Sequence, residues 1–373
     1  MKIAFVAPRY PPEMDGVGDH AAKLAYALSR LGNDVVVITT GDPRPDNPVE
    51  VRIVGRTWSL GAAIRSAAVV RATRADAVFL EYTPFLFGGR SFVPLLLPML
   101  CRVPTFVFVH EIFYASGTAS VKSRWKKIYF EYRDRAVLAM CRGIFVPNIV
   151  RRDRILANVG NAYAAKISIA PIGSNLEPSA GHQWSPDARN GHRKRIVTFG
   201  VVASRRRLER AIDALAILKD RNIDAELRIV GRIWDQPYAD ACRERAREAG
   251  ISELVTFTGS LPETAIGDEF LRADAVAYMA AEGLTSSAGS LLAAFAYGAP
   301  VVATRNPHDE DRLGAVVTLT DDTAEDFADA FVGAFARPND IARRATAATE
   351  LYRSTFGWDA SAATIASRLA SEI

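Results

Sequence analysis

The chain has 373 residues, of which 49% are hydrophobic and 24% charged, and its formal net charge is +4. This composition excludes a disordered chain, and the length exceeds one compact core, so two domains are expected. The three cysteines lie far apart without a CxxC pair, which argues against a disulfide framework and favours a cytoplasmic location. Neither zinc-finger spacing nor an RNA-reading aromatic motif is present, so no nucleic-acid partner is expected.

The first residues, MKIAFVAPRY, begin directly on an apolar run, so we expect no signal peptide. The most apolar patch, 93–100, is interrupted by Pro94 and Pro98. It is also shorter than the roughly 20 apolar residues that a membrane-spanning helix requires. We therefore expect no transmembrane helix.

Short apolar runs alternate with helical stretches in the first half of the chain. Runs without polar alternation, set between helices, indicate parallel strands that are buried on both faces of a sheet. The expected strands are 3–7, 34–39, 77–80, 105–109, 143–146 and 167–170. The segment 20–31 has apolar residues at helical spacing and stops at Gly32, which predicts a helix.

The same rhythm restarts after 173–192, a polar stretch with Gly, Pro, Ser and Asn that is typical of a linker. Two βα series joined by one linker predict an α/β protein with two doubly wound, Rossmann-like domains, 1–178 and 179–355. Because ligands of open α/β sheets bind beyond the carboxyl ends of the strands, we expect the site in the cleft between the domains. The later elements are strands 196–199, 226–230, 255–258, 275–278 and 301–303, and helices 208–219, 237–249 and 290–297.

The first connection between a strand and a helix, 8–19, contains Gly16, Val17 and Gly18. Glycines let the backbone approach a bulky ligand, and the N–H groups of a helix N-terminus can bind an anion. The dinucleotide fingerprint GxGxxG is incomplete, because position 21 is Ala21. The pattern therefore predicts either a phosphate-binding loop or a tight structural turn.

Seven segments, in one fixed order, resemble glycosyltransferase family 4 proteins of the GT-B fold. The opening segment is PRYPPEMDGVGDHAAKLAYALSRLGNDVVVIT, and the others are VHE at 109–111, APIGSN at 170–175, FG at 199–200 with Arg205-Arg206, RIVG at 228–231, VTFTG at 255–259 and FGW at 356–358. The resemblance implies a Gly-rich loop under the donor sugar and phosphate. It also implies that a C-terminal helix, 356–373, crosses back to the N-terminal domain.

His110 directly follows an apolar strand-like run, where a side chain can face a ligand. The resemblance implies that this histidine contacts the sugar near the reacting carbon, and a strand-end histidine bonded to backbone is the alternative. Arg205 and Arg206 lie where the family has a phosphate-binding lysine, and arginine can give a diphosphate two parallel donors. We favour Arg206 over Arg205, whereas a solvated patch of charges is the alternative.

The loop 281–291 departs from the family, which usually has two glutamates eight positions apart. Counted from Glu282 the second position is Ser290, and counted back from the glycine at 298 the pair is Thr285 and Ala293. In either register the second glutamate is missing. The loop instead offers Ser286, Ser287, Gly289 and Ser290 to a diphosphate at a helix N-terminus, with Ser290 as the expected cap, or it is only a helix cap.

The resemblance implies a retaining glycosyltransferase that takes a nucleoside-diphosphate sugar as donor substrate, without a metal or other cofactor. His110 and Glu282 are the candidate catalytic residues, and the histidines show no metal-ligand spacing. Two alternatives stay open: a sugar-nucleotide epimerase of the same fold, and a non-catalytic sugar-nucleotide-binding protein. The missing glutamate and Val201, where the family commonly has arginine, motivate the latter.

Residues 122–135, KSRWKKIYFEYRDR, interleave basic and aromatic side chains. A basic amphipathic helix of this kind can lie on a membrane, although a solvated helix face is the commoner explanation. We expect the acceptor to be a small molecule, a glycan or a lipid-linked molecule. Peripheral contact with the inner face of a membrane is a further expectation.

Overall fold

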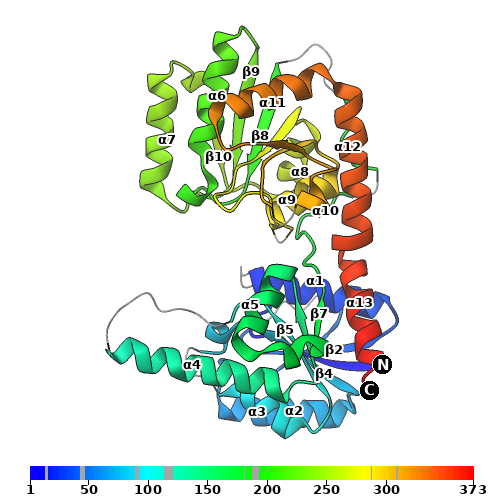
Figure 1. Cartoon of the computed structure of the whole chain (residues 1–373). Helices are drawn as coiled ribbons and strands as arrows, with labels where there is room; N and C mark the ends of the chain where they lie inside the picture. Colours follow the sequence, from blue (N-terminus) through cyan, green and yellow to red (C-terminus); the bar gives the residue numbers. More distant parts are fainter. Residues whose placement is uncertain are drawn as a thin grey trace. The chain divides into compact units, whose positions relative to one another are not determined.

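The computed structural model describes residues 1–12, 16–42, 47–88, 92–112, 121–179, 181–186, 193–286, 288–307 and 310–373. The chain forms two compact units. Unit 1 comprises Met1–Gly173 and Gly357–Ile373, and unit 2 comprises Ser174–Phe356. Each unit is a parallel sheet with helices on both faces (Figure 1).

Unit 1 is built on a seven-stranded sheet in the order β3-β2-β1-β4-β5-β6-β7. The strands are β1 (Lys2–Val6), β2 (Asp34–Thr39), β3 (Glu50–Ile53), β4 (Ala77–Tyr82), β5 (Thr105–Val109), β6 (Gly143–Val146) and β7 (Ile167–Ile169). The helices are α1 (Gly16–Arg30), α2 (Leu60–Thr73), α3 (Val93–Cys101), α4 (Val121–Met140), α5 (Ile149–Val159) and α13 (Trp358–Ala370), with a short 3-10 helix, η1 (Pro84–Phe87), after β4.

Alternating side chains of each strand enter two different cores of unit 1. Val78 and Leu80 of β4 pack towards α2 and α3, whereas Phe79 packs with residues of α1 and α13. Figure 1 shows α1 and α13 together on one side of this sheet and α2, α3 and α4 together on the other. Both faces of the strands are therefore buried, as their continuous apolar runs predict.

Unit 2 has a six-stranded sheet in the order β10-β9-β8-β11-β12-β13. The strands are β8 (Lys194–Phe199), β9 (Ala225–Val230), β10 (Val255–Gly259), β11 (Ala275–Tyr278), β12 (Val301–Thr304) and β13 (Thr318–Thr320). The helices are α6 (Leu208–Asp220), α7 (Gln236–Glu248), α8 (Glu263–Leu271), α9 (Gly289–Tyr297), α10 (Glu310–Leu313), α11 (Ala324–Ala336) and α12 (Pro338–Leu351), with a 3-10 turn, η4 (Ser204–Arg206), after β8.

The two parallel α/β sheets confirm the expected fold class. Two strands, β3 and β13, were not expected, because both lie at sheet edges and are short. The residues 174–178, expected in the N-terminal domain, lie with unit 2. The Tyr352 hydroxyl holds them there, since it accepts a hydrogen bond from the Ser174 backbone N–H at 3.2 Å and donates to Glu177 at 2.9 Å.

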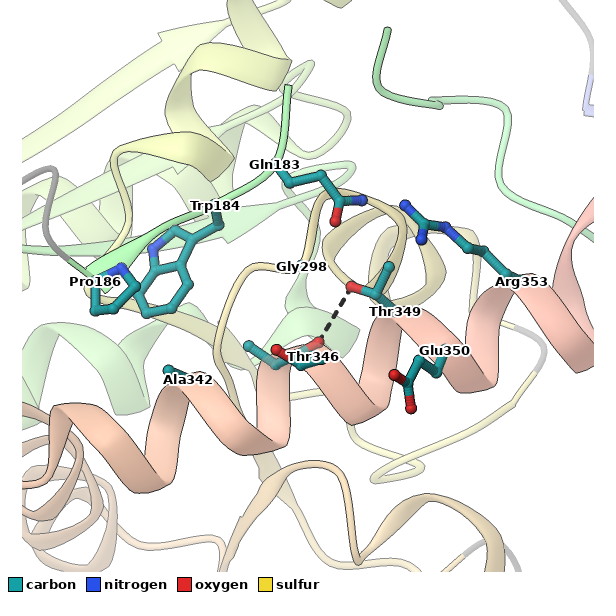
Figure 2. A pocket seen from close by; sticks show the side chains of 10 residues that line it. Gln183, Trp184, Pro186, Gly298, Ala342, Thr346, Thr349, Glu350 and Arg353 are labelled. Carbon is teal, nitrogen blue, oxygen red and sulfur yellow. Dashed lines mark hydrogen bonds between the residues drawn. The ribbon is translucent and has the colours of Figure 1, made fainter. Parts of the chain in front are cut away.

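Within the expected linker, Trp184 packs against unit 2. The Trp184 indole donates to the Ala273 carbonyl at 2.6 Å, and the Trp184 backbone N–H donates to Tyr297 at 3.0 Å. This segment and α12 line a cavity of about 140 Å³. Figure 2 shows the side chains that line it. Gln183, Trp184 and Arg353 line the cavity, and none of the predicted donor-site residues does.

Helix α13 belongs to unit 1, where Trp358 anchors it. The Trp358 side chain is 4% exposed and covers Gly173, the last residue of the first segment of unit 1. A Cβ atom at Gly173 would lie 2.7 Å from the Trp358 ring, so only glycine permits this contact.

We predict that Gly173→Ala lowers the free energy of unfolding of unit 1 by about 1–3 kcal/mol, the usual cost of overpacking a core. Gly16→Ala is the matched control in the same unit, because a Cβ atom at Gly16 would meet nothing within 4 Å. Denaturant unfolding followed by tryptophan fluorescence measures both variants. Equal stability of the two variants would contradict the packing of Trp358 on Gly173.

Candidate functional site

The strand order of unit 1 reverses between β1 and β4, and three polar side chains meet beside that reversal. His20 lies on α1, which follows β1; Glu81 lies in β4; His110 follows β5. His20 Nδ1 is 3.1 Å from Glu81 Oε1, and His110 Nε2 is 2.5 Å from Glu81 Oε2. The two imidazole rings stand edge to face, with centroids 4.6 Å apart.

Burial makes this cluster electrostatically unusual. Glu81 has no exposed surface, and burial alone would raise its pKa. The charges and hydrogen bonds of His20 and His110 outweigh that effect and lower the pKa of Glu81 to about 2. Burial lowers the pKa of His110, although Glu81 opposes the shift. The shifts therefore favour an ionised Glu81 and disfavour a charged His110.

His110 thus lies at the end of a strand as expected, but its partner is a carboxylate as well as backbone. Its backbone N–H donates to Tyr82 at 3.1 Å, and its side chain is 9% exposed. Sequence reasoning missed Glu81 and His20. The available signal was a single acidic residue in the otherwise apolar and aromatic run AVFLEY.

The predicted glycine segment begins α1 instead of preceding it, because the helix starts at Gly16 rather than near residue 20. Gly16 is exposed and Val17 half-buried, whereas Gly18 is buried. A Cβ atom at Gly18 would lie 3.4 Å from the backbone of Arg9 and of Tyr10. Part of the predicted loop, 13–15, lies outside the described residues.

The strand order of unit 2 reverses between β8 and β11, and Arg206 lies beside that reversal. Arg206 Nη2 donates to the Phe199 carbonyl at 2.6 Å and to Ser290 Oγ at 2.8 Å. The guanidinium carbon also lies 5.7 Å from the centre of the Tyr278 ring. Arg206 therefore connects the end of β8, the end of β11 and the first turn of α9.

Gly200 makes this position of Arg206 possible. Its φ is +132°, and a Cβ atom there would collide with the Arg206 guanidinium. Burial lowers the pKa of Arg206, while Tyr278 and then Glu282 act in the opposite direction. The guanidinium remains charged in a partly desolvated place, where its interaction with an anion is stronger than in water.

The serine-rich loop meets Arg206 at the N-terminus of α9. The helix begins at Gly289 with Ala288 as its cap residue and no side-chain cap, so the expectation that Ser290 is the cap was wrong. Ser290 instead accepts the hydrogen bond from Arg206. Ser286 is buried, and Ser287 lies outside the described residues. In the other register, Ala293 is fully buried within α9.

The remaining predicted residues of unit 2 are solvent-exposed. The side chains of Arg205 and Glu282 are both exposed, but the Arg205 carbonyl accepts a hydrogen bond from the Ala281 N–H at 2.9 Å. This bond joins the 204–206 turn to the loop that carries Glu282. Arg206, Ser290 and the Glu282 loop are thus brought together within unit 2, while Gly16–Gly18 and His110 belong to unit 1.

His20, Glu81 and His110 also form a group, found among the described residues, whose potential metal-ligand atoms all lie within 4.8 Å of one another. The sequence spacing concealed this group, because His20 and His110 lie 61 and 29 positions from Glu81. In the structure, each carboxylate oxygen is already bonded to an imidazole nitrogen. That the reaction needs no metal stays a prediction.

The segment 122–135 lies in α4, and two residues of its C-terminal part are buried. Arg133 and Asp134 are 3% and 1% exposed, and the buried Tyr82 hydroxyl donates to Asp134 at 2.5 Å. Ile128 and Tyr132, in contrast, are 38% and 71% exposed. None of the helices in the described parts of the chain is both long and apolar enough to cross a bilayer.

Two family models match consecutive parts of the chain. A glycosyl transferase 4-like domain matches residues 15–173, and a model of glycosyl transferases group 1 matches residues 193–337. A comparison with curated proteins finds no match.

Solved structures of similar fold cover the whole chain. Anabaena HepE in complex with UDP has a TM-score of 0.73 at 16% identity, with 100% of both chains covered. Sucrose-phosphate synthase from Thermosynechococcus elongatus has a TM-score of 0.71 at 16% identity, covering 100% of this chain and 98% of that one. A glycosyltransferase from Rickettsia africae has a TM-score of 0.73 at 13% identity, covering 99% and 98%.

The two matched models follow each other in the order of units 1 and 2, and together they account for most of the chain. The similar structures have the same two-domain architecture. The protein is a family 4-like glycosyltransferase of the GT-B fold.

Proposed function

We propose that the protein transfers a sugar from a nucleoside-diphosphate donor to an acceptor bound mainly by unit 1, with retention at the anomeric carbon and without a metal. The observation that carries the proposal is the Arg206–Ser290 hydrogen bond, which places a partly desolvated cation at an uncapped helix N-terminus. Helix N-termini and arginine side chains both favour phosphate oxygens. The UDP bound to the similar Anabaena HepE supports a donor of this class.

The roles follow from the charge that develops during transfer. As the bond between the sugar and the diphosphate breaks, negative charge grows on the leaving oxygen. Arg206 and the first turn of α9, with Gly289 and Ser290, would stabilise that charge, and Gly16–Gly18 would approach the donor through backbone. Arg205, Ser286 and Ser287 would add further donors. Glu282 would orient the hydroxyls of the sugar, and His110 would contact the sugar near the reacting carbon.

A panel of sugar nucleotides, incubated with and without acceptor extracts, tests the reaction. We expect free nucleoside diphosphate to accumulate only when acceptor is present, and EDTA to leave the rate unchanged. An altered sugar nucleotide in the absence of acceptor would identify an epimerase instead, and binding without turnover would identify a non-catalytic protein. Loss of turnover in EDTA that Mg²⁺ restores would contradict metal independence.

We predict that Arg206→Ala weakens nucleoside-diphosphate binding by about 1.5–3 kcal/mol, the scale of a hydrogen bond to a charged group. Arg205→Ala is the matched control, because its exposed side chain leaves the backbone bond to Ala281 intact, and its loss should be smaller. Calorimetry with UDP and other nucleoside diphosphates measures both variants. Unchanged affinity in Arg206→Ala would remove Arg206 from the site.

Peripheral membrane contact through 122–135 and a lipid-linked acceptor form the finer part of the proposal. An apolar groove of about 410 Å³ in unit 1 supports them, with Leu60 and Phe92 exposed at its edge. Trp58 lines the groove and donates to the Pro8 carbonyl at 2.8 Å, close after β1. Phe92 also contacts Tyr129 of α4, with ring centroids 5.8 Å apart. The groove therefore adjoins both the start of the glycine segment and α4.

We predict that Tyr132→Ser in α4 weakens sedimentation with vesicles that contain anionic lipid. Burial of an apolar side chain is worth about 1.5–3 kcal/mol, so the partition constant should fall about tenfold or more. Leu31→Ser is the matched control, because Leu31 is 46% exposed just after α1, away from α4. Equal losses in the two variants would contradict a specific membrane face on α4.

A further inference from the structure

The buried cluster of His20, Glu81 and His110 in unit 1 has more hydrogen-bonding groups than a sugar could contact directly. Glu81 has no exposed surface, and His20 is 2% exposed, so neither offers a ligand much surface. His110 is the most exposed of the three at 9%. Glu81 and His20 can therefore influence a ligand mainly through His110.

The geometry fixes where the imidazole protons lie. An ionised carboxylate accepts hydrogen bonds and donates none. Each nitrogen that faces Glu81 must then carry a proton, namely His20 Nδ1 and His110 Nε2. In a neutral imidazole only one nitrogen carries a proton, so the other nitrogen of the ring is an acceptor.

We propose that Glu81 is a positioning residue that holds His110 in the Nε2–H form and keeps the Nδ1–H of His20 on its carboxylate, so that His110 presents an acceptor nitrogen and the site takes a hydroxyl group of a sugar rather than a phosphate. This inference rests on the proposed function for the identity of the ligand. An acceptor lone pair beside a buried carboxylate attracts hydroxyl hydrogens and repels anions. The cluster of unit 1 and Arg206 of unit 2 therefore favour different chemical groups, a hydroxyl and a phosphate respectively.

The surroundings of the cluster support this arrangement of protons. The ring of Phe108 lies 4.5 Å from His20 between centroids, and the ring of Trp358 lies 5.2 Å away. These rings contribute to the burial of the cluster. The charges of His20 and then of Arg151 lower the pKa of His110 in the same direction as burial does, and so disfavour an imidazolium there.

Nitrogen-15 NMR of the histidine-labelled protein without substrate tests the proton positions directly, because the chain has only five histidines to assign. We expect His20 as Nδ1–H and His110 as Nε2–H at neutral pH. A His20 ring without a proton on Nδ1, or a doubly protonated His110 ring, would overturn the proposal. This measurement needs no variant, so a folding defect in a variant cannot obscure it.

Glu81→Gln tests the consequence for the reaction. The amide has one acceptor oxygen and one donor NH₂ group, so it can keep the proton position of only one ring. We expect the other ring to move its proton to the outer nitrogen, and kcat/KM to fall tenfold or more, while affinity for the nucleoside diphosphate stays unchanged. Unchanged tautomers and unchanged kcat/KM in this variant would overturn the proposal.

Glu269→Gln is the matched control. Glu269 is 8% exposed and bonds Arg228 in unit 2, so its replacement should leave every histidine signal as in the natural protein. A change of the His20 or His110 signals in this control would show that the signals report general loosening, against a specific role of Glu81. The expected tautomers in a protein that never turns over would support the positioning and refute the transferase proposal instead.

Discussion

The reversal of strand order, beside β1 in unit 1 and beside β8 in unit 2, is the constraint on which the polar cluster of each unit depends. On the two sides of such a reversal, the connections leave towards opposite faces of the sheet, so a crevice opens at the carboxyl ends of the strands. In unit 1, His20 lies on α1, which follows β1, and Glu81 lies within β4. In unit 2, Arg206 lies in the turn after β8, and Ser290 lies on α9, which follows β11. Each unit thus places its polar groups at the same topological position, although the two sets differ in chemistry.

The fold could be predicted from the sequence because strands buried on both faces leave continuous apolar runs. Where a strand lies at an edge, that signal disappears. In β3, Glu50, Arg52 and Ile53 are exposed, and the polar and apolar residues alternate without a core to enforce the pattern. The start of α1 was misplaced for a related reason, since glycines in a first turn resemble a loop until packing against Arg9 and Tyr10 is known.

The residues of the candidate site also differ in how far the sequence predicts their positions. The positions of His110 and Arg206 could be predicted because both follow directly after strand-like runs or their turns, whereas their roles stay predictions. Glu81 and His20 could not be assigned, because their meeting depends on sheet register and on the side of the sheet that α1 covers. The register pairs Glu81 of β4 with Phe108 of β5, and Phe108 lies two residues before His110. Because alternate residues of a strand share a face, Glu81 and His110 both point to the face that carries α1. Nothing local in the sequence encodes that pairing.

The contrast between two arginines of unit 2 explains why Arg206 is suited to bind an anion. Arg228 donates to both oxygens of Glu269, and this hydrogen bond is the main reason that its pKa is raised. Its charge is therefore already neutralised within the fold. The described partners of Arg206 are a carbonyl, a hydroxyl and the face of an aromatic ring. These partners orient the guanidinium without cancelling its charge.

A cation that is desolvated and oriented, yet not neutralised, loses stability in the free protein, as the lowered pKa of Arg206 indicates. An arriving diphosphate would recover that loss, because it supplies the missing negative charge in a place already shielded from water. The folding free energy of unit 2 therefore includes the cost of holding Arg206 in this state. In the proposed reaction the gain would appear only when an anion binds, and it would grow as negative charge develops on the leaving group.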